Sequence, residues 1–201
     1  MSLVTDIMGV VKEKTCIVGM GNYLRKDDAV GLYLVDELQS EVNSDQVLLL
    51  NVEDIIESYV FKIAELDCEN VLIIDAVKST TSPGSIIFGR LTNCGEVLNG
   101  YSTHQLSLTL CGKILEESGK KTYLLGVEAG DTDFGQGLSK DVKQSADLLK
   151  DIIIEIISSN NKFIVDYDKQ ENENFSDNNY NLIREKSESL SGILNKSNKK
   201  I

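Results

Sequence analysis

TCIVGMGNYLRKDDAVG, residues 15–31, places a short apolar run, two glycines and a pair of acids one after another. The run at 15–18 has the length of a buried strand, and Gly19 and Gly21 after it indicate a loop with positive φ or close backbone approach. A Rossmann loop would need a third glycine where Leu24 stands, and a Walker A loop would need Gly-Lys-Ser/Thr. The stretch therefore predicts a strand, a tight loop and a helix, and it disfavours a nucleotide-binding domain.

Apolar strands and amphipathic helices alternate along the rest of the chain. The sequence predicts strands at 15–18, 47–52, 70–75, 85–91 and 122–127, and helices at 28–40, 58–66, 104–117 and 139–157. The third strand is apolar at nearly every position, as expected when helices cover both faces of a sheet. This alternation predicts an α/β fold, a three-layer sandwich with a mostly parallel sheet. Right-handed crossovers would place the functional loops at the carboxyl ends of the strands.

The ordered domain is predicted to end before the chain does. The chain has 201 residues, 41% hydrophobic and 26% charged, which is typical of a globular protein. Residues 159–201 are rich in Asn and poor in large apolar side chains, so they cannot bury enough surface to offset the entropy of ordering. We therefore expect an α/β domain over 1–158 and a weakly ordered or peripheral tail over 159–201. Apolar spacing at 180–194 is compatible with a short helix in that tail.

Composition also excludes several classes of partner and compartment. A net charge of −12 argues against nucleic acid, because phosphate binding needs clustered Lys and Arg. No apolar run approaches the roughly 20 residues of a membrane span, and residues 1–14 do not form a secretory signal. Four scattered cysteines without a Cys-x-x-Cys pair fit a reducing compartment, so we expect a cytoplasmic protein. Cys111 is expected to pack in the core.

Three potential metal ligands are predicted to lie at one edge of the sheet. Asp28 follows the first strand, Asp75 ends the third, and His104, the single histidine, opens a predicted helix. Because ligands of α/β proteins bind at this edge, the three could form an open-sided set suited to nickel, zinc, iron or manganese. The alternatives are solvated or capping acids and an ordinary surface or core histidine. Asp27 could equally cap the helix that starts near Asp28. No Ser or Cys nucleophile constellation accompanies them.

Together these segments resemble the nickel–iron hydrogenase maturation endopeptidases over roughly residues 14–158. The resemblance is carried by VGMGNYLRKDDAVG at 18–31, LIIDA at 72–76, PG at 83–84, STHQLSL at 102–108, LGV at 125–127 and GLS at 137–139. It implies an α/β/α sandwich around a twisted five-stranded sheet. It also implies a cytoplasmic hydrolase, of the aspartyl-type peptidases, that clips a C-terminal extension from the hydrogenase large-subunit precursor after nickel insertion.

The resemblance further implies which residues form the site. The metal ligands would be Asp28, Asp75 and His104, with no separate catalytic group, and the substrate-binding loop would contain Gly19, Gly21, Asn22 and Asp27. Nickel would be supplied by the substrate, and zinc or cadmium is expected to substitute in vitro. A monomer is favoured.

One departure and two rival interpretations stay open. Many relatives have a glycine pair after the second strand, where this chain has Asn51 and Val52 before two acids, which leaves the substrate open. One rival is a checkpoint protein that binds the precursor in a nickel-dependent way without cutting it. The other is a peptidase like the spore germination proteases, which share a related fold.

Overall fold

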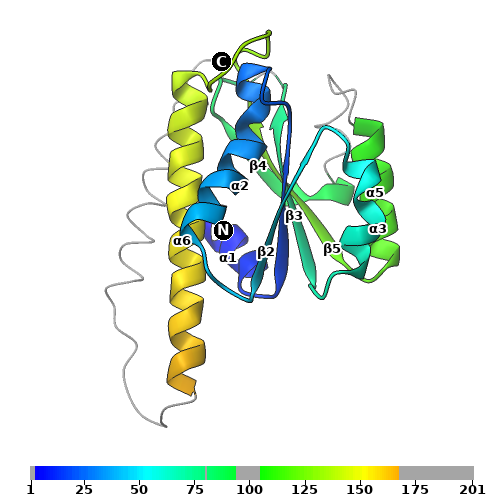
Figure 1. Ribbon diagram of the computed structural model, residues 1–201, viewed down its shortest axis with the longest axis vertical. Coiled ribbons are helices and arrows are strands. Elements are labelled where there is room, and N and C mark those ends of the chain that lie inside the picture. Colours follow the sequence, from blue (N-terminus) through cyan, green and yellow to red (C-terminus); the bar gives the residue numbers. More distant parts are fainter. Residues whose placement is uncertain (1–2, 80, 94–104, 168–201) are drawn as a thin grey trace.

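A single five-stranded sheet forms the centre of the molecule (Figure 1). The computed structural model describes residues 3–79, 81–93 and 105–167. Its strands are β1 (Thr15–Met20), β2 (Val47–Glu53), β3 (Asn70–Val77), β4 (Ile86–Arg90) and β5 (Lys121–Glu128). The strand order is β2-β1-β3-β5-β4, with β4 antiparallel to β5 and every other pairing parallel. The predicted mostly parallel sheet is confirmed.

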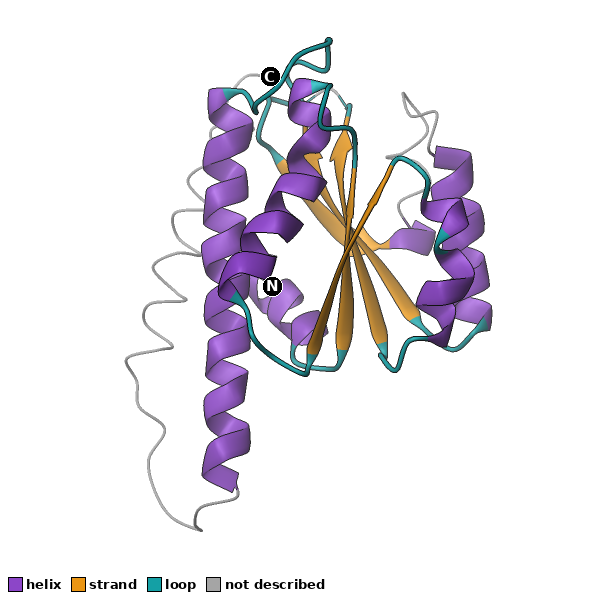
Figure 2. Cartoon of the chain, viewed as in Figure 1, coloured by secondary structure: helices purple, strands orange, loops and turns teal. Residues whose placement is uncertain are grey.

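Helices cover both faces of the sheet and complete the predicted three layers (Figure 2). On one face lie α1 (Leu3–Val11), α2 (Val30–Glu41) and α6 (Lys140–Tyr167), and on the other α3 (Val60–Glu65) and α5 (Gln105–Glu117). Short 3-10 turns η1 (Lys26–Ala29), η2 (Ile56–Ser58) and η3 (Leu91–Asn93) join them. Each face has its own buried apolar cluster, which explains why the central strands are apolar on both sides.

Burial decreases from the middle of the sheet to its edge. All six residues of β1 are buried, and all but one of β3, since each has a strand on both sides and helices above and below. In β2, which forms an edge, only Val47 and Val52 are buried. Among the described helices, none is long and apolar enough to cross a membrane.

Two helices differ from the sequence prediction. No helix is predicted at the N-terminus, yet α1 buries Val4, Ile7, Val10 and Val11 against α6 and the sheet, and their near-helical spacing was the available signal. The last helix, α6, continues ten residues beyond the predicted end at 157. Residues 180–194, whose apolar spacing is compatible with a short helix, lie outside the described residues, and the division into 1–158 and 159–201 stays a prediction.

Candidate functional site

Two of the predicted ligands meet at the carboxyl edge of the sheet. Strands β1 and β3 are parallel neighbours, so the turn η1 that follows β1 lies beside the end of β3. Asp75, near the end of β3, is 6% exposed, and Asp28 in η1 is half-buried. Burial, together with the negative charge of Asp28, raises the pKa of Asp75 from 3.8 to about 7, although the Ala76 amide opposes this shift. The two carboxylates therefore interact, and a cation between them would relieve their repulsion.

Glycines allow the Asp28 turn to lie directly on the strands. Gly21 has φ of +129°, and a Cβ on it would lie 1.7 Å from the carbonyl oxygen of Asp28. A Cβ on Gly31 would lie 2.2 Å from the carbonyl oxygen of Ile74. A Cβ on Gly19 would meet the Asn51 side chain. The predicted positive φ and close approach after β1 are thus confirmed, because only a residue without a side chain fits these positions.

Asp27 joins two loops at the edge of the site. Its side chain is fully buried, and its carboxylate accepts four hydrogen bonds. The backbone N–H groups of Gly130, Asp131 and Ser139 donate at 2.9, 2.8 and 2.6 Å, and the Ser139 hydroxyl donates at 2.9 Å. Asp27 does not cap its own helical turn; it holds the loop before α6. Its predicted contact with substrate stays a prediction.

Glu128 is a further buried carboxylate that sequence reasoning missed. It lies at the end of β5, and its carboxylate accepts hydrogen bonds from the Ser79 amide at 2.7 Å and the Ser79 hydroxyl at 2.6 Å. The Thr81 hydroxyl donates to it at 3.2 Å. Glu128 thereby anchors the loop that follows Asp75. The signal was present, because an acid ends this buried strand as Asp75 ends β3.

Asn22 and Asn51 order the loops on the other flank of the site. The side-chain oxygen of Asn22 accepts from the Leu24 amide at 2.9 Å, which closes a local turn. The Asn51 amide and the Tyr23 hydroxyl both donate to Asp36, at 2.7 and 2.8 Å. Burial and the Asp36 hydrogen bond raise the pKa of Tyr23 to about 12. Asn51, the departure noted in the sequence, thus ties the end of β2 to α2.

His104 lies outside the described residues. Helix α5 begins at Gln105, so the predicted helix over 104–117 is present from 105 on, while the role of His104 in opening it stays a prediction. Within the part of the chain that the structure describes, no three His, Cys, Asp or Glu side chains are grouped so that they could hold a metal. Asp28 and Asp75 are therefore brought together, while the complete ligand set stays a prediction.

Fold and site define an α/β protein with paired acids at the carboxyl edge of its sheet. Known proteins share its fold. The family model of the hydrogenase maturation protease HycI matches residues 32–156. A candidate hydrogenase maturation protease of Methanocaldococcus jannaschii is 30% identical over 154 residues, which is 72% of this chain and 89% of that protein. The chain belongs to the hydrogenase maturation protease family.

Solved structures agree with this assignment. The nickel–iron hydrogenase maturation protease HycI of Thermococcus kodakarensis KOD1 is similar with a TM-score of 0.67 and 30% identity, covering 76% of this chain and 99% of that one. The Escherichia coli endopeptidase HybD has a TM-score of 0.61 and 22% identity, covering 74% and 93%, which supports the fold. The resemblance seen in the sequence is confirmed, and with it a protease of the hydrolase class.

Proposed function

We propose that this chain removes a C-terminal extension from the large-subunit precursor of a nickel–iron hydrogenase once nickel has been inserted. Membership in the maturation protease family gives the reaction class. The observation that carries the proposal is the pairing of Asp28 with Asp75, whose pKa is raised by burial and by the charge of Asp28, so that a positive counter-charge would favour the ionised pair. A metal ion presented by the precursor would supply that counter-charge.

Nickel enters this reaction as part of the substrate. Asp28, Asp75 and His104 would bind it, and zinc or cadmium would substitute in vitro. Capture of the metal would align the scissile peptide bond at the carboxyl edge, so that proximity lowers the barrier. Alternatively, the metal would polarise the scissile carbonyl and acidify a bound water. We favour capture, because two carboxylates and one imidazole form a modest metal site on their own.

The same residues would also serve a checkpoint protein that binds the precursor without cutting it. One observation favours this second candidate. Among the described residues, Asp27 and Glu128 are the other buried carboxylates at this edge, and both accept hydrogen bonds from loop amides and hydroxyls, which gives them a structural role in place of a catalytic one. Cleavage distinguishes the two. We place either activity in the cytoplasm, in keeping with the free thiols of Cys16, Cys68 and Cys111.

Substitution of the paired acids tests the proposal. Nickel-loaded precursor is incubated with the purified wild-type chain, with Asp28→Ala and with Asp75→Asn, and loss of the C-terminal peptide is read by intact mass. The matched control is Asp45→Asn, at an exposed aspartate. We expect at least a 100-fold slower cleavage in both site variants and none of this loss in the control. Wild-type rates in both site variants would contradict the assignment, and binding without cleavage by the wild type would support the checkpoint.

A further inference from the structure

Strand β2 leaves one edge of the sheet open. Among the described residues it pairs with β1 alone, so its outer backbone N–H and C=O groups have no strand partner. Proteins usually protect such an edge with charges, proline or a cover, because an exposed edge invites pairing with another chain. The strand contains no proline, and its one charge is at its last residue, the exposed Glu53, while residues 47–52, VLLLNV, are uncharged. This edge is therefore suited to accept a further strand.

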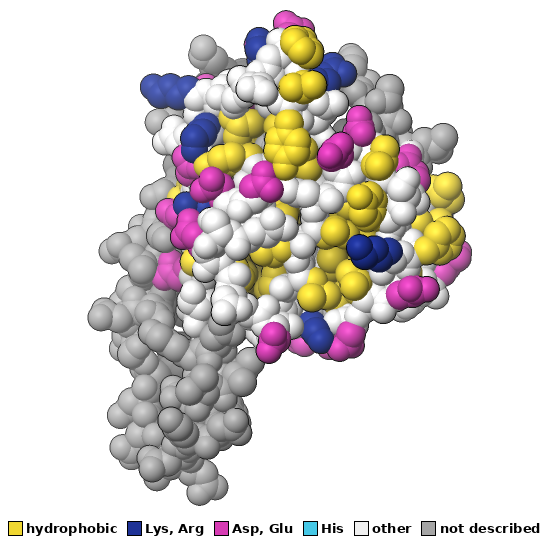
Figure 3. Space-filling view, viewed as in Figure 1, with side chains coloured by type: hydrophobic (Ala, Val, Ile, Leu, Met, Phe, Trp, Pro, Cys, Tyr) yellow, Lys and Arg dark blue, Asp and Glu magenta, His cyan; other side chains and the backbone are white. Residues whose placement is uncertain are grey.

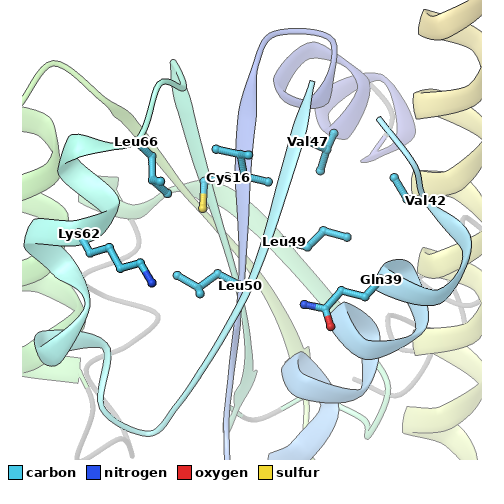
Figure 4. A pocket seen from close by; sticks show the side chains of 9 residues that line it. Cys16, Gln39, Val42, Val47, Leu49, Leu50, Lys62 and Leu66 are labelled. Carbon is cyan, nitrogen blue, oxygen red and sulfur yellow. The ribbon is translucent and has the colours of Figure 1, made fainter. Parts of the chain in front are cut away.

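A hollow of about 340 Å³ runs along this edge between α2 and α3 (Figure 4). Leu49 lies on the α2 side with Gln39 and Val42. Leu50 lies on the α3 side with Lys62, and the neighbouring leucines of β2 are only half-buried. Successive side chains of β2 thus point to opposite sides of the strand. The side chains of an extended peptide paired with β2 would alternate in the same way and meet the hollow on both sides.

The apolar character continues beyond the hollow. Phe61 of α3 is 69% exposed and Ile55, just after β2, is 48% exposed. Figure 3 shows hydrophobic side chains gathered on this face of the molecule. Lys62 is exposed, and within the described part of the chain it forms no ion pair. An apolar segment that carries a carboxylate would fit this surface.

The edge leads directly to the candidate site. The carbonyl of Glu53, the last residue of β2, accepts a hydrogen bond from the Gly21 amide at 3.1 Å. Gly21 in turn packs on the backbone of Asp28. A peptide paired along the seven residues of β2 would span about 23 Å and leave the strand at the carboxyl edge of the sheet, with β2 between it and the Asp28 turn that follows β1. Continuity with the site favours a substrate segment over a second copy of this chain.

We propose that the outer edge of β2 binds an extended apolar segment of the hydrogenase precursor as an added strand, with a carboxylate of that segment opposite Lys62. Backbone hydrogen bonds to β2 provide the affinity, and the leucine-lined hollow selects the side chains. The bound segment directs the adjoining peptide toward Asp28 and Asp75. This inference rests on the proposed function, but the interaction itself needs no nickel.

Hydrogen exchange of the full chain tests the docking directly. Nickel-free precursor is used, because it stays uncut if cleavage requires nickel. We expect the outward-facing backbone amides, which alternate along residues 47–53 with those bonded to β1, to exchange at least 10-fold more slowly in its presence. Unchanged exchange in these amides, while nickel-loaded precursor is still cleaved, would overturn the docking and leave the proposed function standing. Slower exchange that grows with protein concentration alone would also overturn it, since the occupant would be a second copy.

Two variants locate the contact by kinetics. Leu50→Lys places a charge on the edge, and Lys62→Glu reverses an exposed charge without touching the core. We expect each to raise KM for nickel-loaded precursor, by about 10-fold and at least 3-fold respectively, with kcat within twofold of wild type. Lys12→Glu, at another exposed lysine, is the matched control and should change neither. If Leu50→Lys is folded and both variants have the wild-type KM, the proposal is overturned.

The precursor experiments also separate docking from catalysis. Protection of β2 by precursor that is never cut, even when nickel-loaded, would support the docking and contradict the endopeptidase. Absence of both binding and cleavage would overturn both.

Discussion

Among the described residues, three buried carboxylates lie at the carboxyl edge of the sheet, and their hydrogen-bond partners distinguish their roles. Asp27 and Glu128 each accept several hydrogen bonds and hold a loop. Asp75 faces the charge of Asp28, and its pKa is raised. A carboxylate whose ionisation destabilises the folded state is typical of a functional position, because buried acids with a structural role normally accept hydrogen bonds.

Asp75→Asn is expected to stabilise the fold at neutral pH while abolishing function. In the unfolded chain Asp75 ionises near 3.8, whereas in the native state it ionises near 7. The native state therefore binds the extra proton between these values, and wild-type stability falls as pH rises from about 4 to 7. Asparagine removes this penalty. Urea unfolding in the presence of a chelator measures the free energy of unfolding of both proteins. The variant-minus-wild-type difference should grow from pH 4 to pH 8, and a pH-independent difference would contradict a buried Asp75 coupled to Asp28.

Asp27→Ala is expected to destabilise the protein by about 1–3 kcal/mol, since it leaves buried loop amides without an acceptor. Urea unfolding at pH 7 measures the change. Asp133→Ala, at an exposed aspartate of the same loop, is the control and should stay within about 0.5 kcal/mol of wild type. Equal values for both variants would show that Asp27 does not hold the loops together.

At the scale of elements, the apolar pattern predicted all five strands of the sheet and four of the five α-helices in the described part of the chain. The strands between helices were recognisable because burial on both faces leaves few polar positions, as in β3, where only Asn70 and Asp75 are polar. Helix α1 was missed because it is short and borders a polar turn, and the end of α6 was missed because residues 158–167 contain several polar side chains. The meeting of Asp28 with Asp75 was predictable from strand ends. The bonds of Asp27 to residues about 100 positions away were not, since only the fold brings them together.

Gly31→Ala tests how α2 packs on the sheet, and Gly9→Ala in α1 serves as its control at an open position. Gly31→Ala would place a Cβ 2.2 Å from backbone, and we expect a loss of about 1–3 kcal/mol or more, because neither strand nor helix can move freely. Gly9→Ala in α1 meets nothing within 4 Å and should stabilise by about 0.5–1 kcal/mol through helix propensity. Thermal unfolding of both variants checks the pair. A neutral Gly31→Ala would contradict the close contact between α2 and the strands.

Over the whole molecule, the parallel sheet sets where chemistry and recognition occur. Its shared carboxyl edge brings together the loops after β1, β3 and β5, and buried acids fix those loops in place. In the described part of the chain, its lateral edge at β2 carries no further strand, and the end of β2 is hydrogen-bonded to the loop that follows β1. A protein built in this way can hold a precursor along one edge and act on it at the other.

The most direct test is to incubate the purified chain with nickel-loaded and nickel-free large-subunit precursor and to read both by intact mass. We predict loss of a C-terminal peptide from the nickel-loaded form alone. Equal cleavage of the two forms would contradict recognition through the metal, and an intact nickel-loaded precursor that stays bound would contradict the endopeptidase.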